Sequence, residues 1–441
     1  MRRLASVGAA ATVLVLALTA CRADDDPGTN GIEGLDVGPG VTEEPCPDAV
    51  NEDNGCIYLG ILSDLSVGPF APLAVPLTAA QEAFWQRVNE EGGLTAEGLD
   101  IAFDVDVVSY QRDTQYDPTE HSRLYEEIKP NILALAQTLG SATTDAILPD
   151  MQASDIIAAP AAWSSLYAFE EVILESGANY CIESMNAVDY AVEAHGIETV
   201  MAVHYEDDYG EDAAAGAKIA AEGHGMEFIS VPTPIGQDNQ AEAVGRVLAE
   251  QPNLVIITTG PAEMAAIVGG TAAQGFTDVR FIGTSPTWNP ALLASPAAEA
   301  LVGLYEQTGP WTDGFDGDTP GHQAMRDALG EVDTVNDGYT SGWIWQYPIK
   351  AALEGALADG DLTRSGVRAA AASLTSVDYE GMLPAGAGNF ADGPDGQLRA
   401  NTINRPDPES PTGVSVAVEL TSFPTAEAYE LTQPCYELLD D

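Results

Sequence analysis

One serine in the sequence stands where its hydroxyl could bind a polar solute. Ser141 follows the apolar run 132–135 and a short loop, and residues 142–145, which include Thr143, have the composition of a first helical turn. A hydroxyl beside the free N–H groups of a helix start is a good receptor for a carboxylate or another polar oxygen. Ser141 could instead act only as the N-cap of this helix, and the two roles are compatible.

A tryptophan stands at the end of another strand-like run. Trp163 follows the apolar run 156–159 after a short stretch of small residues. Its large, flat ring could form a lid or a stacking wall for a ligand. The same ring could equally close the core of a lobe, and the sequence leaves both interpretations open.

The common catalytic motifs are missing from the sequence. There is no GxxxxGKS/T, HExxH, GxSxG or CxxC, and the five histidines are scattered along the chain. The segment 386–391 has a glycine spacing like that of a dinucleotide loop, but it opens no helix, so we interpret it as a turn. The acidic segment 313–318 lacks the spacing and the closing Glu of an EF-hand. The sequence therefore predicts a protein that is not an enzyme and uses neither a cofactor nor a metal.

The elements that must position these residues alternate between strands and helices. Strand-like runs occur at 57–62, 101–109, 132–135, 156–159, 199–204, 226–231, 254–258 and 280–283, and most are separated by amphipathic segments. Repeated strand–helix–strand units predict parallel sheets with helices on both faces. A chain of 441 residues suggests two successive sheets, with a break near 179–180. The tail at 398–403 and 414–420 returns to strand-like sequence, so the chain crosses between the lobes more than once and makes a multi-stranded hinge.

The charge balance restricts the partners of this surface. The formal net charge is −53, from 16 Lys and Arg against 69 Asp and Glu. Such a surface repels nucleic acid and bare anionic membrane. We therefore expect no nucleic-acid partner.

The first twenty residues predict an export signal. Arg2 and Arg3 precede an apolar run at 7–20, which is too short to span a bilayer comfortably. The Leu-Thr-Ala-Cys sequence that ends at Cys21 resembles the lipobox of bacterial lipoproteins, in which the cysteine carries lipid and becomes the mature N-terminus. A plain secretory signal with a chance cysteine is the alternative.

Residues 21–45 are rich in Gly, Pro and acidic residues, and we expect a flexible tether there.

The cysteines after Cys21 are even in number, which fits an exported protein with disulfides. Four cysteines allow three pairings. Cys46 and Cys56 close a short loop where order should begin, so we predict a disulfide between them, which leaves Cys181 with Cys435. The alternative for the second pair is two free buried thiols.

Several short motifs occur in an order and spacing that resemble one family. They are LGIL at 59–62, GP at 68–69, VNEEGG at 88–93, DP at 117–118, LGSATT at 139–144, APAA at 159–162 and DDYG at 207–210. Together, behind a lipobox, they resemble the leucine/isoleucine/valine-binding branch of type I periplasmic binding proteins, the solute receptors of ABC importers. The resemblance covers residues 57 to about 420.

The resemblance implies an α/β fold of two Rossmann-like lobes, joined by a multi-stranded hinge, that close on a solute. Lobe one would comprise 57–178 and 311–395, and lobe two 179–310 and 396–441. The implied protein is a monomer outside the cytoplasm, anchored to the cell membrane by its N-terminal lipid, that hands a small polar solute to an ABC permease. Two alternatives are a lipoprotein of the same fold that reports to a membrane sensor and, more distantly, an extracytoplasmic hydrolase.

The resemblance also implies roles for individual residues. The serine at the position of Ser141 binds the ligand carboxylate in the family, and the segment with Ala162, Trp163 and Ser164 supplies backbone groups and a hydroxyl. Tyr209 matches an aromatic residue that folds over the solute in the family, and the alternative is a tyrosine at a helix start that packs locally. We expect Thr143 and Thr284 to contact the ligand as well. Thr284 stands in the segment where the family's amino-acid receptors place an acidic residue for the ligand ammonium, and no acid occurs at 283–288. Amides, ureas, aromatic acids and other small polar metabolites therefore remain open beside amino acids.

Overall fold

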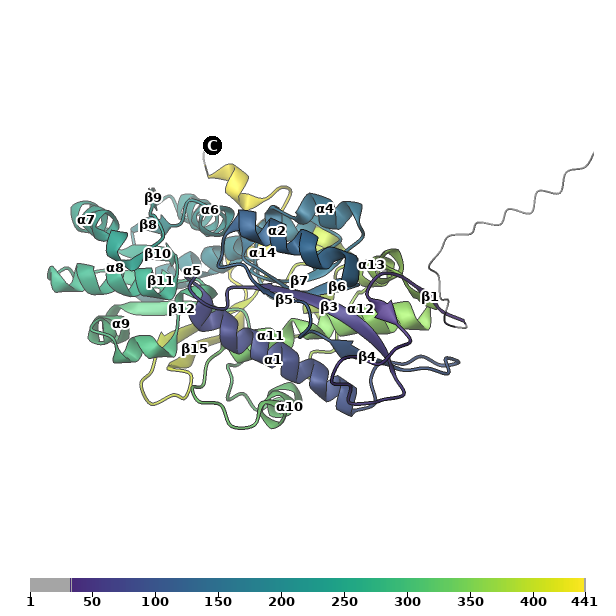
Figure 1. The fold of residues 1–441 in the computed structure, drawn as a ribbon. Helices are drawn as coiled ribbons and strands as arrows, with labels where there is room; N and C mark the ends of the chain where they lie inside the picture. Colours follow the sequence, from purple (N-terminus) through teal and green to yellow (C-terminus); the bar gives the residue numbers. More distant parts are fainter. Residues whose placement is uncertain (1–31, 33, 440–441) are drawn as a thin grey trace, which may run out of the picture.

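The computed structural model describes residue 32 and residues 34–439, which form two lobes around separate sheets (Figure 1). The first lobe contains a six-stranded sheet in which the long strand β3 pairs in parallel with β4, β5 and β6. Its strands are β2 (Val41–Thr42), β3 (Gly55–Ser63), β4 (Phe103–Asp106), β5 (Gln111–Asp113), β6 (Ala134–Leu139) and β7 (Ala158–Ala161). Only β2 runs antiparallel to its neighbour.

The second lobe contains a seven-stranded sheet in the order β15-β14-β12-β11-β10-β8-β9. Its strands are β8 (Thr199–His204), β9 (Glu227–Pro232), β10 (Leu254–Thr258), β11 (Arg280–Gly283), β12 (Tyr305–Gly309), β14 (Asn401–Pro406) and β15 (Val414–Thr421). The strands β8 to β12 pair in parallel, whereas β14 and β15 are antiparallel additions at one edge. Every residue of β10 is buried, as expected for a parallel strand covered on both faces.

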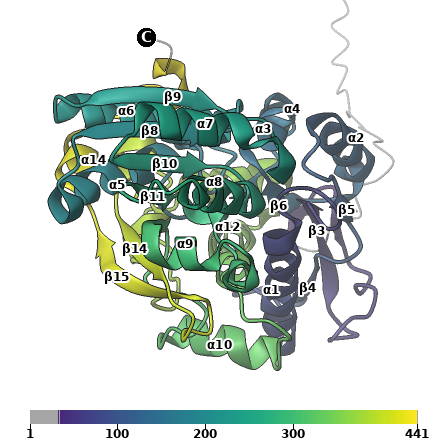
Figure 2. The same ribbon diagram turned by 90° about the vertical axis from the view of Figure 1, so that its left-hand side faces the viewer.

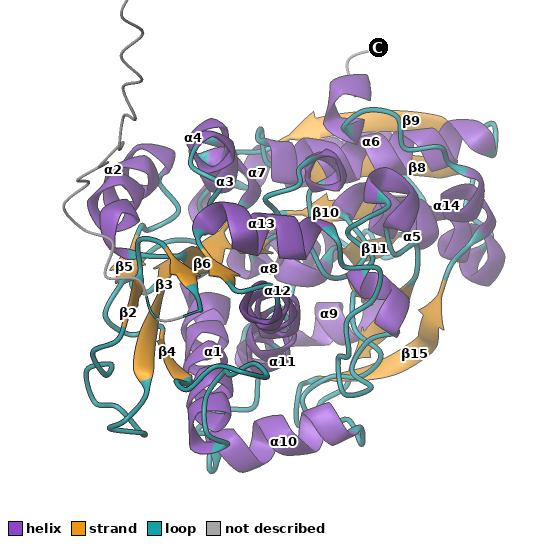
Figure 3. Ribbon diagram, turned by 90° about the vertical axis from the view of Figure 1, so that its right-hand side faces the viewer, coloured by secondary structure: helices purple, strands orange, loops and turns teal. Residues whose placement is uncertain are grey.

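Helices cover the sheets of both lobes (Figures 2 and 3). The first-lobe helices are α1 (Ala71–Glu90), α2 (Pro118–Ile128), α3 (Ser141–Asp145), α4 (Leu148–Ala153), α10 (Pro320–Leu329), α11 (Gly338–Ile344), α12 (Gln346–Ala358) and α13 (Arg364–Ala372). The second-lobe helices are α5 (Tyr180–His195), α6 (Asp208–Gly223), α7 (Ala241–Glu250), α8 (Pro261–Ala273), α9 (Ala298–Leu304) and α14 (Pro424–Ala428). Among the described residues, no helix combines the length and apolar character needed to cross a membrane.

The chain passes between the lobes three times, after β7, after β12 and before β14. Two consecutive lobes joined by several connections form the multi-stranded hinge predicted from the sequence. The strands of the second sheet lie between residues 199 and 309 or between 401 and 421. The residues at which each lobe begins and ends stay a prediction.

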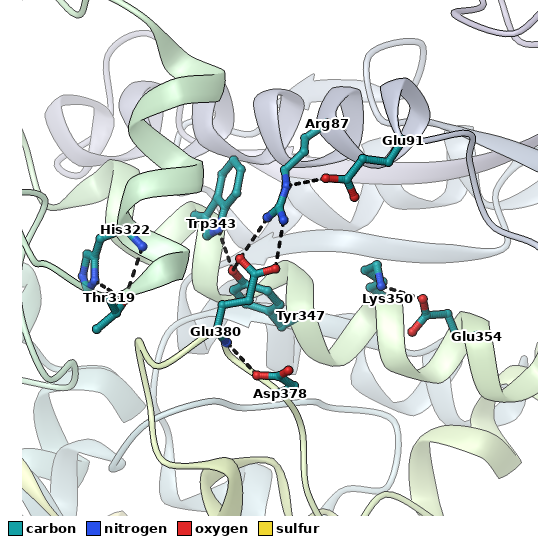
Figure 4. Close-up of polar contacts among 10 residues, drawn as sticks. All are labelled: Arg87, Glu91, Thr319, His322, Trp343, Tyr347, Lys350, Glu354, Asp378 and Glu380. Carbon is teal, nitrogen blue, oxygen red and sulfur yellow. Dashed lines mark hydrogen bonds and ion pairs between the residues drawn. The ribbon is translucent and has the colours of Figure 1, made fainter.

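The second pass of the chain through the first lobe is fixed to helix α1. The guanidinium of Arg87 donates two hydrogen bonds, of 3.0 and 2.9 Å, to the carboxylate of Glu380 (Figure 4). The hydroxyl of Tyr347 donates to the same carboxylate at 3.0 Å and accepts the indole N–H of Trp343 at 2.9 Å. Helix α11 packs so closely on α1 that a Cβ on Gly342 would lie 2.1 Å from the backbone oxygen of Leu77. These contacts hold α11 and α12 rigidly beside the first sheet.

The N-terminal part of the described chain corrects the predicted tether. Strand β1 (Asp36–Val37) pairs in parallel with β13 (Asp361–Leu362), and β2 pairs with β3. Leu35 is 4% exposed and packs in the core of the first lobe. The prediction of a tether is wrong for residues 36–42, because their backbone hydrogen bonds and the apolar Leu35 fasten them to the lobe. The predicted signal peptide and Cys21 lie outside the described residues.

Both predicted disulfides are present. Cys46 is bonded to Cys56, and Cys181 is bonded to Cys435. The alternative of two free thiols in the second pair is therefore wrong. Cys181 is the second residue of helix α5, so the second disulfide ties the C-terminal segment to the start of this helix. The two cysteines are 254 residues apart in the sequence.

Helices α5 and α6 cross at a glycine, which generates a stability prediction. A Cβ on Gly216 would lie 2.1 Å from the backbone oxygen of Cys181, whereas a Cβ on Gly245 in α7 would meet nothing within 4 Å. We expect Gly216→Ala to lower the free energy of unfolding by about 1–3 kcal/mol through overpacking. Gly245→Ala should leave it unchanged or raise it by up to about 1 kcal/mol, because alanine favours the helix. Urea unfolding of both variants measures this, and equal stability would contradict the close approach.

Candidate functional site

A cavity of about 540 Å³ lies between the lobes. Its inner walls are aromatic and come from both lobes and the connection between them. The aromatic lining residues are Phe70, Tyr116, Trp163, Tyr180, Tyr209, Trp288, Trp311 and Trp345. Each of these side chains is buried, and none is more than 9% exposed. Such a wall favours a solute with a substantial apolar or aromatic body.

The outer part of the cavity is acidic. Its lining includes the carboxyl groups of Asp313, Asp316, Asp318, Asp337, Asp407 and Glu409. Four of these residues are exposed, so they mark the mouth of the cavity, between the segment 313–318 and the turn that joins β14 to β15. Among the described residues that line the cavity, none is a lysine, an arginine or a histidine. No group of His, Cys, Asp and Glu in the described part of the chain is arranged to hold a metal.

Ser141 stands on the inner wall, as its position after β6 predicted. The residue is fully buried and lines the cavity. Its hydroxyl has no hydrogen-bond partner among the described residues. The residue before it, Gly140, has a φ of +93°, and a Cβ there would lie 2.5 Å from the ring of Tyr116. Glycine at this position therefore lets Tyr116 and Ser141 share the same wall.

Tyr209 lines the opposite wall, in the second lobe. Its ring meets the edge of Phe70, from the first lobe, at a centroid distance of 5.9 Å. Its hydroxyl donates to the backbone oxygen of Thr259 at 3.2 Å and is 3.0 Å from the hydroxyl oxygen of Thr284. Thr284 thus fixes the orientation of Tyr209 and does not itself line the cavity.

Trp163 lines the cavity at the end of β7. Its indole N–H donates to the backbone oxygen of Ser176 at 2.7 Å, so this donor is already used. The ring contacts Tyr180 at 5.9 Å and Trp345 at 5.0 Å between centroids. Trp163 therefore lines the cavity and is also a packing residue, and its contact with a ligand stays a prediction.

Three other predicted residues lie outside the cavity. The hydroxyl of Thr143 donates to the backbone oxygen of Gly140 at 3.0 Å and also contacts the backbone oxygen of Leu139. Ala162 belongs to an apolar cluster on the far side of the first sheet. The hydroxyl of Ser164 accepts the N–H of Leu166 at 3.4 Å at the start of a short 3₁₀ helix. The structure therefore brings Ser141, Trp163 and Tyr209 together at the cavity, whereas these three residues and Thr284 do not line it.

Among the lining residues that the sequence did not predict, two carry a buried polar atom without a partner in the described part of the chain. The indole N–H of Trp345 and the side-chain oxygen of Gln307 are buried without a hydrogen-bond partner among the described residues. Trp345 stands between helices α11 and α12, and Gln307 lies in β12. The tryptophan-rich stretch 339–357 was visible in the sequence, but nothing local indicated which ring faces the cavity.

The sequence of the chain agrees with this geometry. The profile of a family described as "Periplasmic binding protein" matches residues 57–403. The chain belongs to this family. The resemblance predicted from the sequence, and the two-lobed fold that it implied, are therefore confirmed.

Solved structures of similar proteins are substrate-binding proteins of ABC transporters. A fatty acid ABC transporter substrate-binding protein from Thermomonospora curvata is 27% identical with a TM-score of 0.81, and the match covers 90% of this chain and 98% of that one. A branched-chain amino acid ABC transporter from Thermus thermophilus with bound valine is 17% identical with a TM-score of 0.69, covering 85% and 98% of the two chains. A solute-binding protein from R. palustris in complex with 4-hydroxybenzoate is 15% identical with a TM-score of 0.68, covering 83% and 97%. The comparison with curated proteins found no match.

Polar contacts of this periplasmic binding protein also join the lobes. The hydroxyl of Tyr116, in the first lobe, donates to the carboxylate of Asp207 at 3.1 Å. The side-chain amide of Asn289, in the second lobe, donates to the backbone oxygen of Pro72 at 3.4 Å. Together with the contact between Phe70 and Tyr209, they show that the lobes are closed on the cavity.

Several carboxyl groups of the binding protein are buried behind the cavity. Burial raises the pKa of Glu183 to about 7, although the hydroxyl of Ser285 donates to this carboxylate at 2.6 Å. Burial also raises the pKa of Asp212 to about 6, even though this carboxylate accepts the backbone N–H groups of Ser165 at 3.0 Å and Cys181 at 3.2 Å. Glu306 is the opposite case. Burial alone would raise its pKa, but Arg405 at 2.7 Å and its other partners hold the pKa below its ordinary value.

These shifts generate a prediction for the pH dependence of stability. A carboxyl group whose pKa is raised on folding destabilises the native state at a pH above that raised pKa, and this cost disappears as the pH falls. We therefore expect Glu183 and Asp212 to increase the free energy of unfolding as the pH falls from about 8 to about 5, because they become protonated in this range. The buried histidines His121, His204 and His322, whose pKa values burial lowers, act in the opposite direction over the same range. Urea unfolding at a series of pH values measures it. Glu183→Gln should remove the contribution of Glu183, so its profile should differ from that of the wild type near neutral pH, and parallel profiles of the two proteins between pH 5 and pH 8 would contradict the assignment.

Proposed function

We propose that this protein is an extracytoplasmic receptor that captures a small solute between its lobes and delivers it to an ABC permease. The main support is the enclosed cavity between the lobes, whose buried wall includes the unpartnered hydroxyl of Ser141. Membership of the periplasmic binding proteins supports the transport role. Among the described residues that line the cavity there is no histidine, cysteine or lysine, and we propose no catalytic step.

The capture mechanism is closure of the lobes. A solute that contacts Ser141 in the first lobe and Tyr209 in the second makes both contacts only in the closed form. Binding then shifts the population of conformations toward closure. The contact of Tyr116 with Asp207 and that of Phe70 with Tyr209 add stabilising interactions to the closed form.

The proposed solute is a small carboxylic acid with an apolar body. The names of three similar structures mention a fatty acid, valine and 4-hydroxybenzoate, which all carry a carboxyl group. The aromatic walls fit an apolar body, and Ser141 offers a free donor to the acid. An amino acid is less well served, because Thr284 holds Tyr209 at the position where an acidic residue was expected.

Loss of the Ser141 hydroxyl tests the site. A hydrogen bond to a charged group contributes about 1.5–3 kcal/mol, so we expect Ser141→Ala to weaken the binding of a carboxylate about tenfold to a hundredfold. Calorimetry with octanoate and with 4-hydroxybenzoate measures the affinity. Ser164→Ala is the matched control, because the same hydroxyl is removed outside the cavity, and it should keep the affinity of the wild type. Unchanged affinity in Ser141→Ala would place the site elsewhere.

We also propose that the mature protein is a monomer held at the membrane by lipid on Cys21. A strongly acidic protein needs such an anchor to stay beside a membrane. We expect Cys21→Ser to move the protein from the membrane fraction to the soluble fraction and to leave solute binding intact. Fractionation of cells that express each form measures this. A variant that stays in the membrane fraction would refute the anchor.

A further inference from the structure

The indole N–H of Trp345 differs from those of the other tryptophans. The chain has six tryptophans, and five of their N–H groups donate to acceptors within the protein. The acceptors are Gln346 for Trp85, Ser176 for Trp163, Thr412 for Trp288, Ser341 for Trp311 and Tyr347 for Trp343. The N–H of Trp345 is buried and has no partner among the described residues. A buried donor without an acceptor costs free energy, so it needs an explanation.

The surroundings of Trp345 prevent its ring from turning toward a protein acceptor. The ring is 2% exposed and packs against Trp163 at 5.0 Å and Trp311 at 6.0 Å between centroids. The next residue, Gln346, donates to the backbone oxygen of Ala136 at 3.2 Å and accepts the N–H of Trp85 at 2.8 Å. The backbone at the junction of α11 and α12 is therefore fixed, and the ring remains part of the cavity wall.

Two buried donors thus lack partners in the first-lobe wall of one cavity, the hydroxyl of Ser141 and the N–H of Trp345. Both are uncharged, and an indole N–H can only donate. The group that satisfies them must therefore present acceptor oxygens. Because no lysine, arginine or histidine is found among the described lining residues, no cation competes for that group.

We propose that Trp345 is a solute-binding residue, and that its indole N–H and the hydroxyl of Ser141 together bind the carboxylate of the solute through uncharged donors alone. This inference rests on the proposed function and deepens it. The acid group binds to the first lobe, and Tyr180 and Tyr209 of the second lobe then close over the apolar body. A ligand that lacks acceptor oxygens would leave both donors buried and unsatisfied, so the pair selects for ligands that present such oxygens, as a carboxylate does.

Phenylalanine substitutions of two cavity tryptophans test the role of this N–H in affinity. Trp345→Phe removes the unpartnered N–H, whereas Trp163→Phe removes an N–H that is already bonded to Ser176, and both remove the same part of the ring. Calorimetry would use butanoate, octanoate, dodecanoate and 4-hydroxybenzoate as probes. We expect Trp345→Phe to weaken binding of the best acid about tenfold to a hundredfold and to exceed the loss in Trp163→Phe.

Nuclear magnetic resonance of the protein labelled with ¹⁵N at the indoles measures the chemical shift of each indole N–H. If Trp345 had only a structural role, its N–H shift would not change when the solute is added. The resonance that is absent from the spectrum of Trp345→Phe belongs to Trp345. In the wild type, this resonance should shift downfield when the acid that binds most tightly is added, because the N–H gains an acceptor. Should Trp345→Phe not fold, phenylalanine variants of the other five tryptophans assign this resonance by elimination.

The outcomes separate this inference from the proposed function. If none of the acids binds to the wild type, the proposed solute class is wrong. If an acid binds, but Trp345→Phe loses no more affinity than Trp163→Phe and the Trp345 resonance does not shift, the inference about Trp345 is overturned and the receptor function stands.

Discussion

A run of aromatic contacts that passes back and forth between the lobes holds the binding site together. Phe70 of the first lobe meets Tyr209 of the second at 5.9 Å, and Tyr209 meets Tyr180 at 4.6 Å. Tyr180 then meets Trp163 of the first lobe at 5.9 Å, and Trp163 meets Trp345. Opening the lobes separates Phe70 from Tyr209 and Trp163 from Tyr180 and exposes apolar surface to water, which is unfavourable. A solute with an apolar body can contact the aromatic rings of both lobes at once only when the lobes are closed. Its binding is therefore coupled to closure.

The excess of negative charge acts on entry more than on affinity. If the solute is the acid proposed above, the carboxyl groups at the mouth and a net charge of −53 repel it as it approaches and slow its association. The exposed acids at the mouth are screened by salt, with a Debye length of about 8 Å at physiological ionic strength. The aromatic residues of the inner wall are buried, and Ser141 and Trp345 there offer unpartnered hydrogen-bond donors to the headgroup of the proposed solute. Rapid uptake of an acid should therefore depend on salt more strongly than its equilibrium affinity does.

The sequence predicted much of the fold because its signals are local. Alternation of apolar runs and amphipathic segments is enough to predict parallel strands, and the short loop between Cys46 and Cys56 is enough to predict their pairing. The position of Ser141 at the cavity could be predicted because ligands of open α/β sheets bind beyond the carboxyl ends of the parallel strands, and Ser141 follows such a strand. The segment 36–42 was misjudged because its composition resembles a tether, while its order comes from pairing with strands far away in the sequence.

The direction of individual side chains could not be predicted in the same way. Thr143 lies two residues after Ser141, and Ser164 directly follows Trp163, and both of these neighbours line the cavity. The hydroxyls of Thr143 and Ser164 form hydrogen bonds with the local backbone instead. Trp345 faces the cavity because α11 and α12 are fixed against α1, partly through Arg87 and Glu380, which are 293 residues apart. Contacts at such separation leave no trace in the spacing of residues around Trp345.

The most direct test of closure is the distance between the lobes with and without solute. Val67 in the first lobe is 76% exposed and Ile235 in the second is 48% exposed, so both can carry spin labels as cysteine variants in a Cys21→Ser background. Double electron–electron resonance measures the distribution of distances between the labels. We predict a broad distribution in the free protein and a shorter, narrow one at saturation with the acid that binds most tightly. An unchanged distribution at a saturation confirmed by calorimetry would contradict capture by closure of the two lobes.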